Sequence, residues 1–69
     1  METRINVVKN WAATAEGVAQ YLPRDYRVTG EDADTIYVAG HDRAGWTAHD
    51  YVIPRLASGL ITATIVDDA

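Results

Sequence analysis

The chain has no cysteine among its 69 residues, and this restricts how so short a chain can be stabilised. A domain of this size buries only about 60% of the surface that its unfolded form exposes, so its apolar core is small. Small domains commonly add disulfides, a structural metal or a partner subunit. The lack of cysteine excludes disulfides, thiolate metal sites and thiol catalysis. The length predicts one domain, residues 1–69, and leaves an apolar surface for a partner as a source of stability.

The charge pattern argues against direct binding of nucleic acid. Ten acidic and six basic residues give a net charge of −4. The basic residues are scattered singly along the chain, as Arg4, Lys9, Arg24, Arg27, Arg43 and Arg55. A nucleic-acid-binding domain normally carries them in a basic stripe. The apolar runs are also too short to span a bilayer or to form a signal peptide, so we expect a cytoplasmic protein.

The first part of the chain predicts a helix followed by a β-hairpin. Apolar residues recur at helical spacing over residues 3–22, with Thr3 as a cap and Pro23 ending the segment. Residues 26–28 and 35–39 are rich in β-branched and aromatic residues, which favours two strands. A polar turn over residues 30–34 separates them, so we expect the two strands to pair antiparallel.

The second part predicts another helix and a final strand. Thr47 and Asp50 have the spacing of a capping box, and Trp46 and Tyr51 that of a hydrophobic staple, so a helix should begin at residue 48. Pro54 should kink or split this helix.

Gly59 is suited to end the helix, and residues 60–66 alternate as a strand. The predicted fold class is α+β, in the order α-β-β-α-β, with a small three-stranded antiparallel sheet and two helices on one face. If the last strand lies at an edge, it offers a surface for dimerisation or β-augmentation.

No residue set in the sequence favours catalysis. The dipeptide His-Asp occurs twice, as His41-Asp42 and His49-Asp50, and such groups can bind metals or transfer protons. The first pair falls in a predicted loop and the second in the first turn of a helix, which favours solvated side chains. Glu31, Asp32 and Asp34 lack the spacing of a calcium loop. We therefore predict no catalytic residue, cofactor or metal.

The aromatic residues are the most suggestive feature for function. Tryptophan and tyrosine supply all six rings, at Trp11, Tyr21, Tyr26, Tyr37, Trp46 and Tyr51. These residue types, with arginine, are enriched at the centres of protein interfaces. We identify Trp46, Tyr51, Arg55 and Tyr37 as candidate partner-binding residues. For Arg55 the alternative is a local role, because a cation near a helix C-terminus is favoured by the helix dipole.

The segment over residues 40–60 reads GHDRAGWTAHDYVIPRLASGL. It resembles small uncharacterised proteins from phages of mycobacteria and related actinobacteria, which carry the pattern GxDxxGWT…YVxPRLxSGL near their C-terminus. The resemblance implies expression in a bacterial host and a host or phage protein as partner. It implies no catalytic activity.

These observations predict a small non-enzymatic protein, encoded by a phage, that binds another protein and self-associates as a homodimer or larger homo-oligomer. One alternative is an acidic mimic of nucleic acid that inhibits a DNA-binding protein of the host. Another is a metal-dependent hydrolase that uses the two His-Asp pairs. The identity of the partner and the symmetry of the oligomer stay open at this stage.

Overall fold

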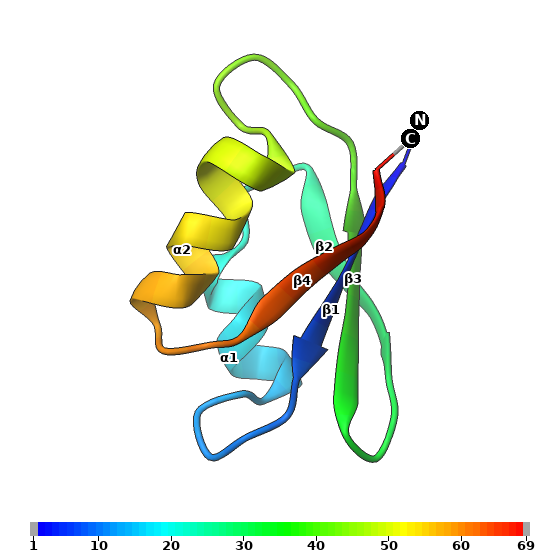
Figure 1. Ribbon diagram of the computed structural model, residues 1–69, viewed down its shortest axis with the longest axis vertical. Helices are drawn as coiled ribbons and strands as arrows, with labels where there is room; N and C mark the ends of the chain where they lie inside the picture. The colour runs from blue at the N-terminus through cyan, green and yellow to red at the C-terminus, as the bar shows by residue number, and fades with distance from the viewer. Residues whose placement is uncertain (1, 69) are drawn as a thin grey trace.

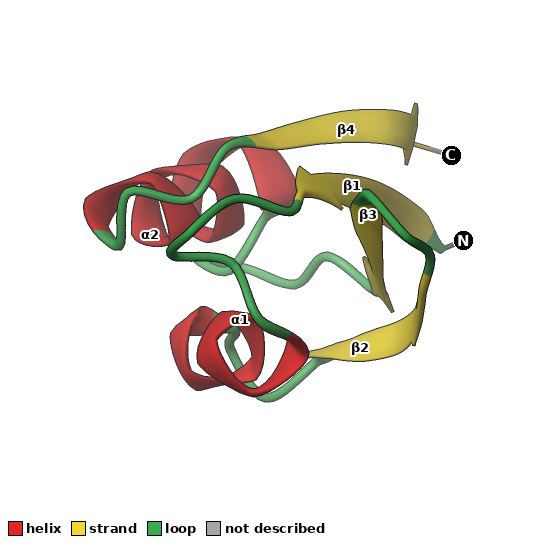
Figure 2. Ribbon diagram, turned by 90° about the horizontal axis from the view of Figure 1, so that it is seen from below, coloured by secondary structure: helices red, strands yellow, loops and turns green. Residues whose placement is uncertain are grey.

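The computed structural model describes residues 2–68, which form a four-stranded antiparallel sheet with helices on one face (Figures 1 and 2). Along the chain the elements are β1 (Thr3–Val8), α1 (Ala15–Tyr21), β2 (Tyr26–Glu31), β3 (Thr35–Gly40), the π-helical turn η1 (Ala48–Val52), α2 (Ile53–Ser58) and β4 (Ala63–Asp68). The strand order is β2-β3-β1-β4. This is the split βαβ, or ferredoxin-like, arrangement. The predicted α+β class is confirmed, but the predicted order and the count of three strands are wrong.

The N-terminal segment accounts for that error. Residues 3–8, predicted as the first turns of a long helix, form the central strand β1. Thr3, Ile5 and Val7 are buried, while Arg4 and Asn6 point to the opposite face. This alternation with a period of two, in a segment rich in β-branched residues, outweighs the helical spacing.

The first helix is only seven residues long. It begins after Thr14, whose hydroxyl accepts a hydrogen bond from the backbone N–H of Gly17 at 3.0 Å. Trp11, which the helical stripe would have buried, lies in the loop before the helix with 86% of its surface exposed. Asn10 shapes this loop, because its side-chain oxygen accepts from the N–H of Ala12.

The predicted hairpin is present, and its first strand is longer than predicted. β2 and β3 pair antiparallel, and β2 includes two residues that the sequence assigned to the turn. Their register passes from Val28↔Val38 to Gly30↔Tyr37, so Thr29 forms a one-residue bulge.

β2 and β4 are the two edges of the sheet, and each contains a bulge. In β4 the register with β1 passes from Arg4↔Asp67 to Ile5↔Ile65, which leaves Val66 as the extra residue. Bulged edges disfavour pairing with another strand. The C-terminal strand β4 therefore lies at an edge of the sheet, where it could pair with a second copy. Its bulge disfavours such pairing.

The second helix begins and divides as predicted. Thr47 is its N-cap, and the hydroxyl accepts from the backbone N–H of Asp50 at 3.1 Å. The first turn is π-helical, and an α-helix starts at Ile53, where Pro54 occupies the first turn. Because proline has no N–H to donate, this position near a helix start is the one that it tolerates.

The end of α2 differs from the prediction in its details. Gly59 has a φ of −91° and does not take the left-handed conformation; Leu60 does, with a φ of 62°. The N–H of Ile61 bonds to the carbonyl of Leu56, which completes a Schellman motif. Glycine is instead suited to position 59 by packing, because a Cβ there would lie 2.6 Å from the Tyr21 ring.

The core lies between the sheet and the helices, as Figure 2 shows. Its buried members come from the strands β1, β2 and β3, from the helices and from the segment before β4: Ile5, Val7, Val18, Ile36, Val38, Val52, Leu56 and Ile61 among others. The other face of the sheet, which we call the open sheet face, has no helix over it. None of the helices in residues 2–68 has the length and hydropathy needed to cross a bilayer.

Candidate functional site

A tight turn after β3 brings the first two members of the candidate site together. The backbone N–H of Trp46 donates to the carbonyl of Arg43 at 2.8 Å, and Gly45 between them has a φ of 81°. A positive φ at the third position of a turn favours glycine. The turn places the Arg43 guanidinium carbon 5.8 Å from the centre of the Trp46 ring.

The helix cap then sets a second ring beside the first. The N–H groups of Tyr51 and Val52 both bond to the carbonyl of Thr47, and the bond from Val52, which spans five residues, is the one that makes the turn π-helical. Tyr51 is thereby aligned with Trp46, and the rings stack with centres 5.7 Å apart and planes 8° apart. This contact confirms the hydrophobic staple that the sequence predicts across the cap.

Arg55 completes the arrangement one helical turn later. Its Nη1 donates to the Tyr51 hydroxyl at 3.2 Å, and its guanidinium carbon lies 5.5 Å from the centre of that ring. We call Arg43, Trp46, Tyr51 and Arg55 the aromatic ladder. Its two rings are half-buried and its two arginines exposed, so the ladder is a surface feature.

The ladder is fastened to the sheet by two carboxylates. Asp42 accepts hydrogen bonds from the Tyr26 hydroxyl and from the backbone N–H of Ala48, the latter at 2.9 Å. Asp25 forms an ion pair with Arg43 at 3.0 Å. The segment that carries the ladder is therefore held at both the loop and the helix start.

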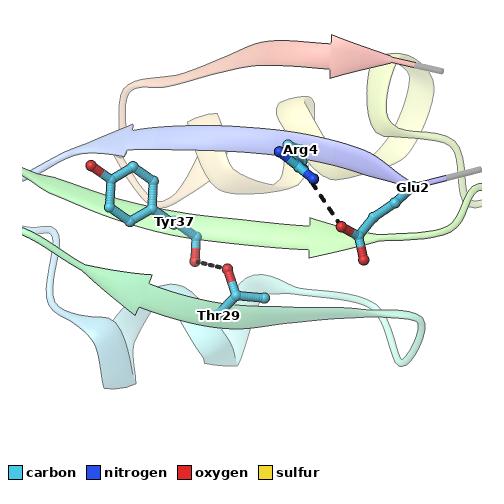
Figure 3. A network of polar contacts seen from close by, with 4 residues as sticks. All are labelled: Glu2, Arg4, Thr29 and Tyr37. Atoms are coloured by element: carbon cyan, nitrogen blue, oxygen red, sulfur yellow. Dashed lines mark hydrogen bonds and ion pairs between the residues drawn. The ribbon is translucent and has the colours of Figure 1, made fainter.

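Tyr37, the fourth candidate from the sequence, lies elsewhere. It belongs to β3 and its ring lies on the open sheet face (Figure 3). Its hydroxyl donates a hydrogen bond to Asp32. This hydrogen bond, together with the negative charges of Asp32 and Asp34, raises the pKa of Tyr37 above its ordinary value of 10.0. The structure thus brings together Trp46, Tyr51 and Arg55 but not Tyr37.

The first His-Asp pair lies in the loop after β3 and the second in η1. Asp42 is occupied by its hydrogen bonds to Tyr26 and Ala48, while His49 and Asp50 are exposed in η1. Within residues 2–68 no group of three histidine, cysteine or acidic residues is arranged to hold a metal ion.

Two features of the ladder are absent from the sequence-based candidates. Arg43 stacks on Trp46, and the local signal for this was the spacing Arg-x-Gly-Trp, which is typical of a turn with glycine at its third position. The role of Asp42 had no such signal, since its partner Tyr26 is 16 residues away.

We compared the chain with protein-family models, with curated proteins and with solved structures, and no match was found in any of the three.

Proposed function

We propose that the protein is a non-enzymatic interaction module that binds a protein partner of the host or the phage through the aromatic ladder. The observation that carries this proposal is the stacked pair Trp46–Tyr51 on the surface, with a guanidinium 5.8 Å from the centre of the Trp46 ring and another 5.5 Å from that of Tyr51. Tryptophan, tyrosine and arginine are the residue types that dominate the energetics of protein interfaces.

The ladder is already ordered without a partner. Each ring contacts the other and one guanidinium, and Asp42 and Asp25 fix the segment from behind. Rings with few rotatable bonds lose little conformational entropy on binding, and a preformed arrangement loses less still. A rigid partner surface can therefore bind here without the ladder having to reorganise.

The charge of the ladder indicates what the partner should carry. Arg43 is paired with Asp25, whereas no salt bridge among residues 2–68 involves Arg55. Arg55 is thus an exposed cation whose guanidinium contacts Tyr51, next to the stacked rings of the ladder. We propose a partner surface with a carboxylate for Arg55 and an apolar side chain for the rings.

Self-association through the same ladder is the second part of the proposal. Bulges at Thr29 and Val66 disfavour pairing of edge strands between two copies. The ladder offers apolar area without that obstacle. Light scattering should show an oligomer for the wild type and a monomer for Trp46→Ala; an oligomer in both would contradict this part.

The partner is sought by affinity capture from an actinobacterial lysate, with four variants beside the wild type. Trp46→Ala and Arg55→Ala should lose the captured protein. Trp11→Ala and Arg24→Ala are the matched controls, because both residues are exposed and lie outside the ladder. We expect the controls to capture the partner as the wild type does.

A stability measurement accompanies the capture. Arg55→Ala should change the free energy of unfolding by less than about 0.5 kcal/mol, since Arg55 is exposed. A large loss of stability in Arg55→Ala would instead favour its local, helix-stabilising role. Equal capture by all five proteins would contradict binding through the ladder.

A further inference from the structure

The open sheet face contains a shallow groove of about 500 Å³. Its walls and floor come from three neighbouring strands and the edge strand β4, with Arg4, Asn6, Arg27, Tyr37, Ala39 and Val66 among the lining residues. We call this the sheet-face groove. Its size falls within the range of about 300–1,000 Å³ that is usual for small-molecule sites.

Two arginines, far apart in sequence, converge in this groove. In the sheet, Ala39 of β3 is directly opposite Arg4 on one side and Arg27 on the other. Adjacent strands are about 4.8 Å apart, so the two Cα atoms are about 10 Å from each other. Arginine side chains are long enough to meet across that distance, and the small side chain of Ala39 between them leaves room for this. The strand register therefore places Arg4 and Arg27 near each other, although they are 23 positions apart in the sequence.

The two cations differ in how many acidic neighbours they have. Arg4 forms a long ion pair with Glu2, at 3.6 Å (Figure 3), and the acidic residue Asp67 of β4 is its register partner on the other side. No salt bridge within the described residues involves Arg27. Arg27 therefore has its charge available for an anion, and an anion placed beside it would compete with Glu2 for Arg4.

An aromatic ring lies next to the arginine pair on the same face. Tyr37 is two residues before Ala39 on β3, about 7 Å away along the strand. Its neighbour across the register is Gly30, which has no side chain to cover the ring. The hydrogen bond from the Tyr37 hydroxyl to Asp32 holds the ring in position.

We propose that the sheet-face groove binds a small nucleotide, with its phosphate between Arg4 and Arg27 and its base stacked on Tyr37. Two guanidiniums are suited to the geometry and charge of a phosphate. Bases stack on exposed aromatic rings of β-sheets. The site is separate from the aromatic ladder, so the proposal does not depend on the protein partner.

The charge distribution favours a mononucleotide over a nucleic-acid strand. Beyond Tyr37 the hairpin carries Glu31, Asp32 and Asp34, which would repel the next phosphates of a chain. Lys9, the nearest other cation of that region, is already paired with Glu31 at 2.7 Å. A single phosphate meets the two arginines and avoids this acidic end.

The proposal is tested by NMR titration of the ¹⁵N-labelled chain with adenosine 5′-monophosphate, adenosine and inorganic phosphate. We expect the mononucleotide to shift amides of β1, β2 and β3, and to bind at least about tenfold more tightly than either fragment, since each fragment lacks one of the two contacts. Equal affinity for the mononucleotide and inorganic phosphate, or no shift in these strands, would overturn the proposal.

Four variants separate the contacts. Arg4→Ala and Arg27→Ala should each weaken binding of adenosine 5′-monophosphate about tenfold, whereas Arg24→Ala, outside the groove, should leave it unchanged. Glu2→Gln should strengthen it, because the variant removes a negative charge and frees Arg4. Weaker binding by Glu2→Gln, or equal weakening by Arg24→Ala, would contradict the assignment.

Two further measurements identify the role of the ring and the kind of ligand. Tyr37→Phe should retain binding and Tyr37→Ala should lose it. A short oligodeoxythymidylate that bound more tightly than the mononucleotide, with steep salt dependence, would show a nucleic-acid site and overturn the proposal. Trp46→Ala should bind the mononucleotide as the wild type does, so failure of the ladder proposal leaves this result intact.

Discussion

The aromatic ladder and the sheet-face groove use the same residue types in opposite ways. In the ladder, arginines and rings contact one another, and the members come from a stretch of 13 residues, Arg43 to Arg55. In the groove, Arg4, Arg27 and Tyr37 come from three strands and leave their charge and ring face open to a ligand. A surface of the first kind is determined by residues that are close in sequence. A surface of the second kind is determined by the strand order and the register of the sheet.

Because of this difference, the two surfaces should respond differently to substitutions. The ladder depends on one loop and one helix start, which are joined to the sheet by Asp42 and Asp25. The groove depends on the sheet itself, whose central strands carry Ile5, Val7, Ile36 and Val38 of the core. Substitutions in the loop should therefore disturb the ladder and leave the groove unchanged.

The largest expected effect is that of Asp42→Ala. It removes the acceptor of the hydrogen bonds from the Tyr26 hydroxyl and the Ala48 N–H. Hydrogen bonds to a charged group contribute about 1.5–3 kcal/mol each, and solvent screening reduces this for Asp42, which is exposed. We therefore expect the free energy of unfolding to fall by about 2–3 kcal/mol in urea denaturation.

The second His-Asp pair supplies the control for that variant. Asp50 is exposed, and Asp50→Ala should change stability by less than about 0.5 kcal/mol. The near-ultraviolet circular dichroism of the stacked Trp46 and Tyr51 should weaken in Asp42→Ala alone. Equal stability of the two variants would show that Asp42 does not anchor the ladder.

A smaller effect is expected for Gly45→Ala. A Cβ at this position meets no atom within 4 Å, so the substitution acts through the backbone, whose φ is +81°. Left-handed conformations disfavour a residue with a Cβ by about 1–2 kcal/mol, and we expect a loss of that size in thermal or urea unfolding. The turn that joins Arg43 to Trp46 should loosen with it.

Gly45→Asn sharpens this test, because asparagine adopts positive φ more readily than alanine. It should lose clearly less stability than Gly45→Ala. If both variants lost the same amount, the cause would lie outside the backbone conformation of the turn. Binding of a mononucleotide at the sheet-face groove should be the same in both variants and the wild type.

The sequence-based predictions succeeded for features set by residues close in sequence and failed for those set by strand pairing. The cap at Thr47, the division at Pro54 and the contact of Trp46 with Tyr51 depend on residues within one turn or loop, and all three are confirmed. The first strand was missed because Ile5 and Val8 also fit a helical stripe. Which period applies is decided by pairing with β3 and β4, and those partners are distant in sequence.

The candidate sites divide in the same manner. Trp46, Tyr51 and Arg55 could be grouped from sequence because the hydrophobic staple pairs Trp46 with Tyr51, and Arg55 follows Tyr51 by four residues on the helix. No local pattern indicates that Arg4 and Arg27 share Ala39 as a neighbour, since this requires the strand order and the exact register. For the same reason, scattered cations in a sequence are weak evidence against an anion site in the folded protein.

The smallest effect concerns the ionisation of Tyr37 in the groove. Its hydroxyl donates to Asp32, and the nearby carboxylates oppose a phenolate, so its pKa is raised above 10.0. Because the folded state keeps this proton to a higher pH than the unfolded chain does, the resulting stability is fully present below pH 10.0. It should be lost as the pH rises through the folded-state pKa.

Ultraviolet absorbance of tyrosinate, taken as the difference between the wild type and Tyr37→Phe, should isolate this titration. Asp32→Asn should lower the pKa of Tyr37 toward its ordinary value, since it removes a negative charge beside the hydroxyl. Asp50→Asn, on the ladder side of the molecule, should not move it. If Asp32→Asn left the titration unchanged, the Tyr37 ring would not be held by Asp32, and the groove would lack the fixed stacking surface that distinguishes it from an ordinary pair of surface arginines.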